Sequence, residues 1–210
     1  MKIPKERTAI VLIEAQNDFL SPGGTMYQYI AEQLKKRNVI PNLQKLLEGA
    51  RGKCKIFYVP FQAFKKGFPE LKKGGPGAAG LRGIEMEMKA DWGTGAWVEG
   101  TPGPEIIDQL KPKDGDIIVR GKLTLDAFHS TALNYLLRAN EIEYVAFAGF
   151  HTNWCVESSA RSAYDLGYRV IALKDCTGTD TDREQEYAEQ VIFPRIGTVM
   201  TSTEFLASLS

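Results

Sequence analysis

The first apolar run of the chain reads Thr8-Ala9-Ile10-Val11-Leu12-Ile13 and contains no charged residue. A second run, Tyr144-Val145-Ala146-Phe147-Ala148-Gly149, has the same character much later in the chain. Neither run alternates apolar with polar residues, which is typical of strands that are buried on both faces of a parallel sheet. We therefore predict that both runs lie inside such a sheet.

Apolar runs of strand length alternate with segments of helical periodicity along most of the chain. Four further predicted strands are 56–60, 117–120, 170–173 and 197–201, and the predicted helices are 39–50, 130–140, 155–166 and 182–191. This order predicts an α/β fold with a doubly wound, predominantly parallel six-stranded sheet and helices on both faces. In such a fold the C-terminal ends of the strands share one edge, where we expect the functional residues.

Composition and charge narrow the class of protein. A chain of 210 residues suffices for one domain with a full core, and we expect a single domain over 1–210. Lys plus Arg and Asp plus Glu both number 26, without long blocks of either sign, which argues against nucleic acid or an anionic membrane as partner. We expect a small-molecule substrate, no membrane span and, because no secretory signal is recognisable, a cytoplasmic location.

Residues 61–103 interrupt this regular order with a glycine-rich insertion. Long irregular insertions in compact domains are usually lids or binding loops. A disordered linker is the alternative, but the aromatic content is higher than linkers usually have. The aromatic residues are Phe61, Phe64, Phe68, Trp92 and Trp97.

Three predicted strand ends each carry a reactive side chain, namely Glu14, Lys122 and Cys155. Cys155 lies where a strand passes into a helix, so we expect the helix dipole and Lys122 to favour its thiolate and to lower its pKa. Glu14 is placed to accept the thiol proton when substrate arrives. The backbone N–H groups of His151 and Cys155 are candidates for an oxyanion hole.

These residues stand in three ordered motifs. They are Val11-Leu12-Ile13-Glu14-Ala15-Gln16-Asn17-Asp18-Phe19, Lys122-Leu123-Thr124-Leu125-Asp126-Ala127-Phe128 and Gly149-Phe150-His151-Thr152-Asn153-Trp154-Cys155-Val156. Together they resemble the isochorismatase-like cysteine hydrolases, a family that includes nicotinamidase, N-carbamoylsarcosine amidohydrolase, biuret hydrolase and ureidoacrylate amidohydrolase. The resemblance runs from Thr8 to the C-terminus, apart from the insertion.

The resemblance implies a catalytic set of Glu14, Lys122 and Cys155. In the implied reaction the cysteine attacks an amide or ureido carbonyl, ammonia or an amine leaves, and water then releases the acid. The resemblance also implies a cis peptide bond between Phe150 and His151, and a homo-oligomer, either a dimer or a tetramer.

Two features depart from the family pattern. The usual acid is Asp, whereas this chain has Glu14, whose extra methylene moves the carboxylate by about an ångström. Either the pocket has adjusted to glutamate, or the activity is weak or altered. Nicotinamidases carry a His-rich metal site beyond the second strand, but residues 57–100 contain no histidine. We therefore expect no metal ion and no cofactor, and nicotinamide is a disfavoured substrate.

The remaining polar, aromatic and cysteine residues have less specific interpretations. The candidates for an apolar substrate-binding wall, each of which is equally compatible with a core position, are Phe19, Trp92, Trp97 and Trp154. Gln62 is a further candidate for substrate binding. We expect structural roles, in fixing loops or filling the core, for Gln16, Asn17, Asp18, Cys54, His129 and Cys176.

Three functions remain open from the sequence. The leading hypothesis is a cysteine-dependent amidohydrolase of small carboxamide, carbamoyl or ureido compounds, since the cysteine favours this branch over isochorismatases, which cleave a vinyl ether without it. The alternative is an impaired family member, suggested by Glu14, that serves as a binding or regulatory protein. A third possibility is a redox-sensing thiol protein that pairs Cys155 with Cys176.

Overall fold

The centre of the protein is a six-stranded sheet in the order β3-β2-β1-β4-β5-β6, with every neighbouring pair parallel. The computed structural model describes residues 2–70 and 97–210. The strands are β1 (Thr8–Ile13), β2 (Lys55–Val59), β3 (Ile117–Ile118), β4 (Tyr144–Phe150), β5 (Arg169–Gly178) and β6 (Gly197–Met200). All the predicted strands are present, which confirms the doubly wound α/β fold.

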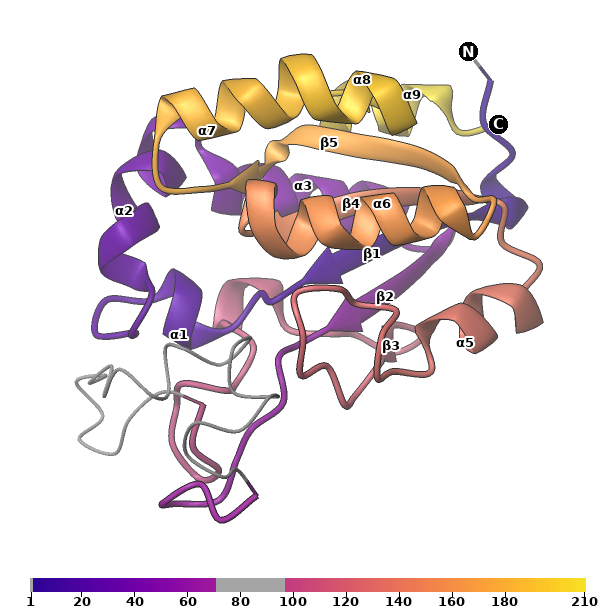
Figure 1. Cartoon of the computed structure of the whole chain (residues 1–210). Coiled ribbons are helices and arrows are strands. Elements are labelled where there is room, and N and C mark those ends of the chain that lie inside the picture. The colour runs from indigo at the N-terminus through magenta and orange to yellow at the C-terminus, as the bar shows by residue number, and fades with distance from the viewer. Residues whose placement is uncertain (1, 71–96) are drawn as a thin grey trace.

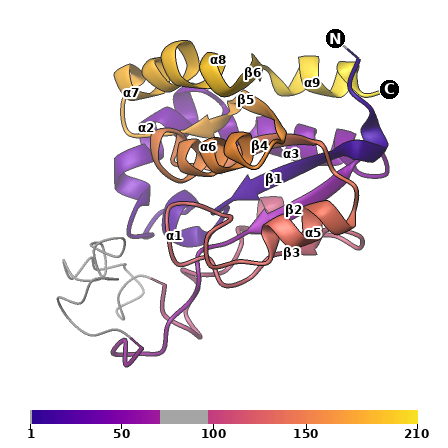
Figure 2. The ribbon, with the colours of Figure 1, turned by 45° about the vertical axis from the view of Figure 1, so that its right-hand side comes forward.

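Helices cover both faces of this sheet (Figure 1). The helices are α1 (Asn17–Leu20), α2 (Tyr27–Lys36), α3 (Val39–Ala50), α5 (Leu133–Ala139), α6 (Glu157–Asp165), α7 (Asp182–Tyr187), α8 (Phe193–Ile196) and α9 (Ser202–Ser208). Alternate residues of β1 pack to opposite sides, so Ile10 and Leu12 join the core under α2, α3 and α9. Ala9, Val11 and Ile13 join the core under α5, α6 and α8. Figure 2 shows these layers from a second direction, with α3 and α6 on opposite sides of the sheet.

Some element boundaries differ from the predicted ones. Residues Thr152–Val156 form a π-helical turn ahead of α6, so Cys155 lies inside this turn and the α-helix starts two residues later. Helix α2 is absent from the predicted elements, and its buried face consists of Ile30, Gln33 and Leu34. A polar residue within the buried stripe weakens the apolar periodicity on which helix prediction depends.

The strand order places β1 beside β4, where the chain changes direction across the sheet. In parallel α/β folds, a crevice for ligands opens at this point beyond the carboxyl ends of the strands. Gly149 of β4 pairs with Ile13 of β1 there, with a φ of +116°. A Cβ atom at Gly149 would lie 2.1 Å from the carbonyl oxygen of Ile13, so glycine is required for the close approach.

Strand β5 continues well beyond its predicted end at Leu173. The four residues 173–176 stand opposite the single residue Ala148, because Phe147 pairs with Ala172 and Gly149 with Thr177. This bulge carries the end of β5 alongside Phe150, next to the turn that holds Cys155. At the opposite edge the two termini lie side by side, and Ile3 bridges Leu209. Within residues 2–70 and 97–210, no helix has the length and apolarity needed to cross a membrane.

Candidate active site

Glu14, Lys122 and Cys155 meet at the C-terminal edge of the sheet, as the sequence predicts. Glu14 directly follows β1, and its backbone N–H donates to the carbonyl of Val59 at 3.2 Å. Lys122 is held by a bridge to Phe61, which prolongs the edge formed by β2 and β3. All three residues are buried, with exposed fractions of 1% for Glu14, 0% for Lys122 and 6% for Cys155.

The ammonium of Lys122 is fully paired despite its burial. Its Nζ donates to Oε1 of Glu14 and, at 2.5 Å, to the carbonyl oxygen of Thr124. It also lies 5.2 Å from the centroid of the Phe61 ring. Burial opposes the charged form, but the attraction of Glu14 and Cys155 outweighs it and raises the pKa of Lys122. This lysine is therefore a permanent positive charge in contact with both other groups.

The thiol of Cys155 behaves differently from the sequence prediction. Burial raises its pKa, and the neighbouring Glu14 carboxylate raises it further, whereas Lys122 acts in the opposite direction without overcoming either. The expected low pKa is therefore wrong for the free protein, in which Cys155 is a thiol. The physical reasons are the complete burial of the sulfur and the adjacent Glu14 carboxylate, which together outweigh the effect of Lys122.

A glutamine fixes the start and the end of the insertion beside the site. The side chain of Gln16 donates to the carbonyls of Phe61 at 3.0 Å and Pro104 at 2.8 Å, and it accepts from the N–H of Phe61 at 2.7 Å. Asn17 donates to the carbonyl of Pro102 at 2.9 Å. The predicted bracing roles of Gln16 and Asn17 are confirmed.

Asp18 also fixes this region. Its Oδ2 accepts a hydrogen bond from the backbone N–H of Trp97 at 2.9 Å. The carboxylate packs directly on Gly103, where an added Cβ would come within 2.3 Å of Oδ2. These contacts agree with a loop-fixing carboxylate rather than a catalytic one.

Two of the candidate wall residues come together. Phe19 and Trp97 are both buried, and their ring centroids lie 5.8 Å apart. Trp154 is half exposed on the turn that carries the cysteine. The backbone N–H of Gln62 donates to the carbonyl of Lys122 at 2.8 Å. Gln62 also lines a surface cavity of about 580 Å³, whose described walls include Arg120 but neither Glu14 nor Cys155. Trp92 lies outside the described residues.

His151 has both of its parts close to the site. Its peptide bond to Phe150 is cis, as the family resemblance implies. Its imidazole is buried between Phe19 and Trp154, with ring centroids 5.8 Å and 6.2 Å away. Burial lowers the pKa of His151 to about 4, so the ring is neutral near pH 7. Its Nδ1 lies 3.5 Å from a carboxylate oxygen of Asp180.

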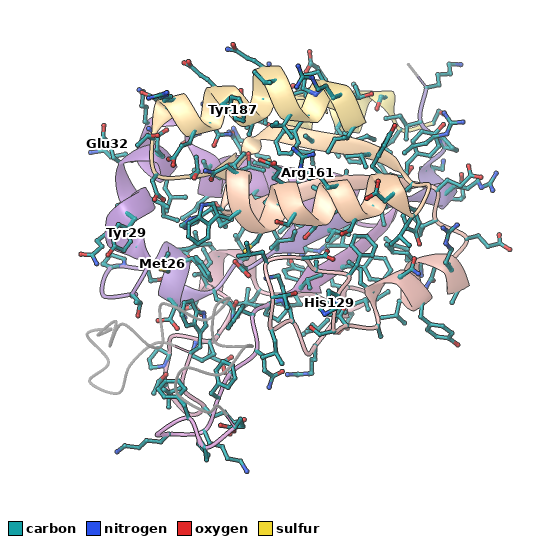
Figure 3. The ribbon with its side chains drawn as sticks, viewed as in Figure 1. Met26, Tyr29, Glu32, His129, Arg161 and Tyr187 are labelled. Carbon is teal, nitrogen blue, oxygen red and sulfur yellow. The ribbon has the colours of Figure 1, made fainter. Side chains whose placement is uncertain are left out.

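The other histidine and the other cysteines take the structural positions expected of them. His129 is exposed on the loop before α5 (Figure 3), and its backbone N–H donates to Asp126 at 3.2 Å. Cys176 is fully buried in the core under α3 and α9, and Cys54 packs at its border. Cys155 belongs to the core on the other face of the sheet. This separation argues against a disulfide between Cys155 and Cys176.

Sequence reasoning missed two partners of Lys122, the Phe61 ring and the Thr124 carbonyl. In the sequence Phe61 is one of several aromatic residues of the insertion, and Thr124 stands two positions after the lysine within its motif. No pattern in the sequence marks a backbone carbonyl as a lysine acceptor. Across the described ranges, no three His, Cys, Asp or Glu side chains gather into a potential metal site.

Comparisons with known proteins identify a family and relatives that are similar to this chain. The isochorismatase domain family matches residues 8–204. The isochorismatase family protein YwoC of Bacillus subtilis is 32% identical over 98% of this chain and 96% of its own length. Ureidoacrylate amidohydrolase RutB of Rhizobium rhizogenes is 29% identical over 97% of this chain and 83% of its own length.

A solved structure shows the same fold. The cysteine hydrolase of Pseudomonas syringae superposes with a TM-score of 0.81 at 24% identity, over 99% of this chain and 94% of that one. At this identity the likeness concerns the fold, while the match over residues 8–204 concerns the family. The chain therefore belongs to the isochorismatase family.

Proposed function

We propose that this protein is a cysteine-dependent amidohydrolase that cleaves a C–N bond in a small carboxamide, carbamoyl or ureido compound. The observation that carries the proposal is the buried contact of the Glu14 carboxylate, the Lys122 ammonium and the Cys155 sulfur. A nucleophile, a proton acceptor and a fixed positive charge are the groups that acyl transfer requires. The relative named ureidoacrylate amidohydrolase supports an amide or ureido substrate.

In the proposed reaction, Glu14 takes the proton of the Cys155 thiol while the sulfur attacks the substrate carbonyl carbon. The carbonyl oxygen becomes an oxyanion that the backbone N–H groups of His151 and Cys155 stabilise. Glu14 then returns the proton to the leaving nitrogen, the C–N bond breaks, and ammonia or an amine departs from a thioester. Water, deprotonated by Glu14, attacks the thioester, and the acid leaves as the thiol is restored.

Lys122 has an electrostatic role in this scheme. In the resting state its ammonium is paired with the Glu14 carboxylate. When the proton moves from sulfur to Glu14, the negative charge moves to Cys155, which the same ammonium also contacts. The buried ammonium therefore has a negatively charged partner both before and after the proton transfer. This avoids the free-energy cost of an unpaired buried charge.

An ammonia-release screen tests the proposal directly. Primary carboxamides and ureido acids are offered to the wild-type protein and to Cys155→Ala, which removes the nucleophile. We expect ammonia release from at least one compound with the wild type only. Release that persists undiminished in Cys155→Ala would refute the mechanism, and no release from any compound would favour a binding or regulatory protein.

We further propose that residues 1–210 act as one domain in a homo-oligomer. The family match over residues 8–204 supports a single domain, and the family resemblance supports a dimer or tetramer. Light scattering on the purified protein measures the number of subunits. The free cysteines Cys54, Cys155 and Cys176 fit a reducing compartment such as the cytoplasm.

A further inference from the structure

The imidazole of His151 holds a buried nitrogen whose purpose the mechanism above does not explain. The residue is 3% exposed, and Nε2 has no hydrogen-bond partner within the part of the chain that the structure describes. Buried polar atoms in native proteins are nearly always hydrogen-bonded, because an unpaired one loses its hydration without compensation. An atom of this kind, on the residue that begins the turn holding Cys155, points to a ligand as its missing partner.

The surroundings of the ring define what this nitrogen offers. Nδ1 lies 3.5 Å from a carboxylate oxygen of Asp180. A lone pair on Nδ1 would face that negative charge, so the favoured neutral tautomer carries its proton on Nδ1. The pKa of about 4 keeps the ring neutral near pH 7. Nε2 therefore has a free lone pair and acts as a hydrogen-bond acceptor.

The location of the ring connects this acceptor with the nucleophile. The carbonyl of His151 accepts the N–H groups of Trp154 and Val156, which lie on either side of Cys155 in the same turn. The imidazole packs edge-on against Phe19, whose ring contacts Trp97 in turn. The imidazole thus belongs to an aromatic cluster with Phe19 and Trp154, and Trp154 lies next to Cys155 in the chain.

We propose that Nε2 of His151 accepts a hydrogen bond from a substrate N–H and so selects ureido compounds over simple carboxamides. This inference rests on the proposed function and narrows its substrate class. Glu14 must face the leaving nitrogen in order to protonate it. A ureido group has a second nitrogen, where a carboxamide has carbon. The N–H of this second nitrogen is free to donate to Nε2 of His151.

A pair of ligands that differ in one N–H tests the inference. N-carbamoyl-β-alanine and glutaramate have the same length and the same carboxylate, but glutaramate has a methylene where the ureido acid has its inner N–H. Binding is measured by calorimetry in the Cys155→Ala background, so that turnover does not interfere. We expect the ureido acid to bind about 10- to 100-fold more tightly, as for a hydrogen bond to an otherwise unpaired buried atom.

Variants of the two histidines identify the source of this preference. Adding His151→Leu should abolish it by weakening the ureido acid alone, whereas His151→Gln, which retains an acceptor oxygen, should keep part of it. The matched control is His129→Leu, at the exposed histidine shown in Figure 3, and should leave both affinities unchanged. Thermal unfolding verifies that each variant is folded.

Three outcomes would overturn the inference: equal affinity for the two ligands, binding of neither, or the same loss for both in His151→Leu. The proposed function is assessed separately, by ammonia release from the wild-type protein. A ureido preference without any turnover would remove the hydrolase proposal and keep the recognition by His151. Turnover by the wild type, together with a ureido preference that His151→Leu leaves intact, would keep the hydrolase proposal and remove the recognition by His151.

Discussion

Replacing Glu14 with Gln separates the ionisation of Cys155 from the catalysis that depends on it. Glutamine has nearly the same shape as glutamate but carries no charge and accepts no proton at neutral pH. In the wild-type protein the Glu14 carboxylate raises the pKa of Cys155 and Lys122 lowers it. In Glu14→Gln burial still raises the pKa of Cys155, but the contribution of Glu14 is gone and that of Lys122 is unopposed by it. The pKa of Cys155 should therefore fall, while hydrolysis loses its proton acceptor.

The structure sets the size of each effect. Loss of a positioned general base costs roughly 10²- to 10⁴-fold in rate. Lys122 is fully buried and forms an ion pair with Glu14 in the wild type, and Glu14→Gln breaks that pair. Removing one partner of a buried pair costs about 3–5 kcal/mol, which corresponds to a melting temperature roughly 6–20 °C lower for a chain of this length.

The assay compares two rates on the same sample. Iodoacetamide alkylation of Cys155 near pH 8 is followed by peptide mass spectrometry, which distinguishes it from the other cysteines, and hydrolysis is followed by ammonia release. We expect faster alkylation and slower hydrolysis in Glu14→Gln. Slower alkylation, or hydrolysis at the wild-type rate, would refute the assignment of Glu14 as the proton acceptor.

Glu14→Asp is the matched control for charge. It keeps the carboxylate but shortens the side chain, which in this protein reaches Lys122 directly. We expect a much smaller loss of stability than in Glu14→Gln, and a rate lower by roughly a hundredfold because the carboxylate is displaced by about an ångström. A rate above that of the wild type would show that the pocket is not adjusted to glutamate.

Three further predictions concern other parts of the site. Cys155→Ala should abolish hydrolysis and leave the circular dichroism spectrum unchanged, because only a small buried side chain is lost. Gly149→Ala should destabilise the protein by roughly 2–4 kcal/mol, since its Cβ would lie 2.1 Å from the Ile13 oxygen; Gly115→Ala, at a φ of +91° with nothing within 4 Å, should cost less in the same urea titration. His151 has a pKa of about 4 in the folded protein against an ordinary value of 6.5, so its stabilising effect is complete above pH 6.5 and is lost as the pH falls towards 4. Relative to His151→Leu, the wild type should lose about 3 kcal/mol of unfolding free energy over that interval, and parallel pH curves would contradict the burial of a neutral ring.

The sequence predicted the sheet well because its strands are uniformly apolar. The bounds of β1 agree with the run Thr8–Ile13 because a buried parallel strand needs no polar residue. The extension of β5 through Lys174 and Asp175 was missed, since charged residues inside a strand are unexpected. Asp175 is satisfied there by Ser202, whose N–H and hydroxyl both donate to it at 2.7 Å. Because Ser202 is distant from Asp175 in the sequence, no local pattern indicates that the two residues pair.

The candidate site shows the same division between local and distant information. Glu14, Lys122 and Cys155 were predictable because each follows a strand, and parallel strands end at one edge. The protonation state of Cys155 was not predictable from the sequence, because it depends on how one ammonium is shared between two acidic groups. That balance is set by three-dimensional distances and by burial, and neither is written in a motif.

The anchoring of Gln16 has a consequence for how this enzyme family diversifies. One side-chain amide holds the backbone at Phe61, the first residue of the insertion, and at Pro104, the residue that follows its end. Changes in the length or composition of the chain between Phe61 and Pro104 need not displace Glu14, which lies two residues from Gln16. The insertion can therefore differ between family members without displacing the carboxylate that pairs with Lys122.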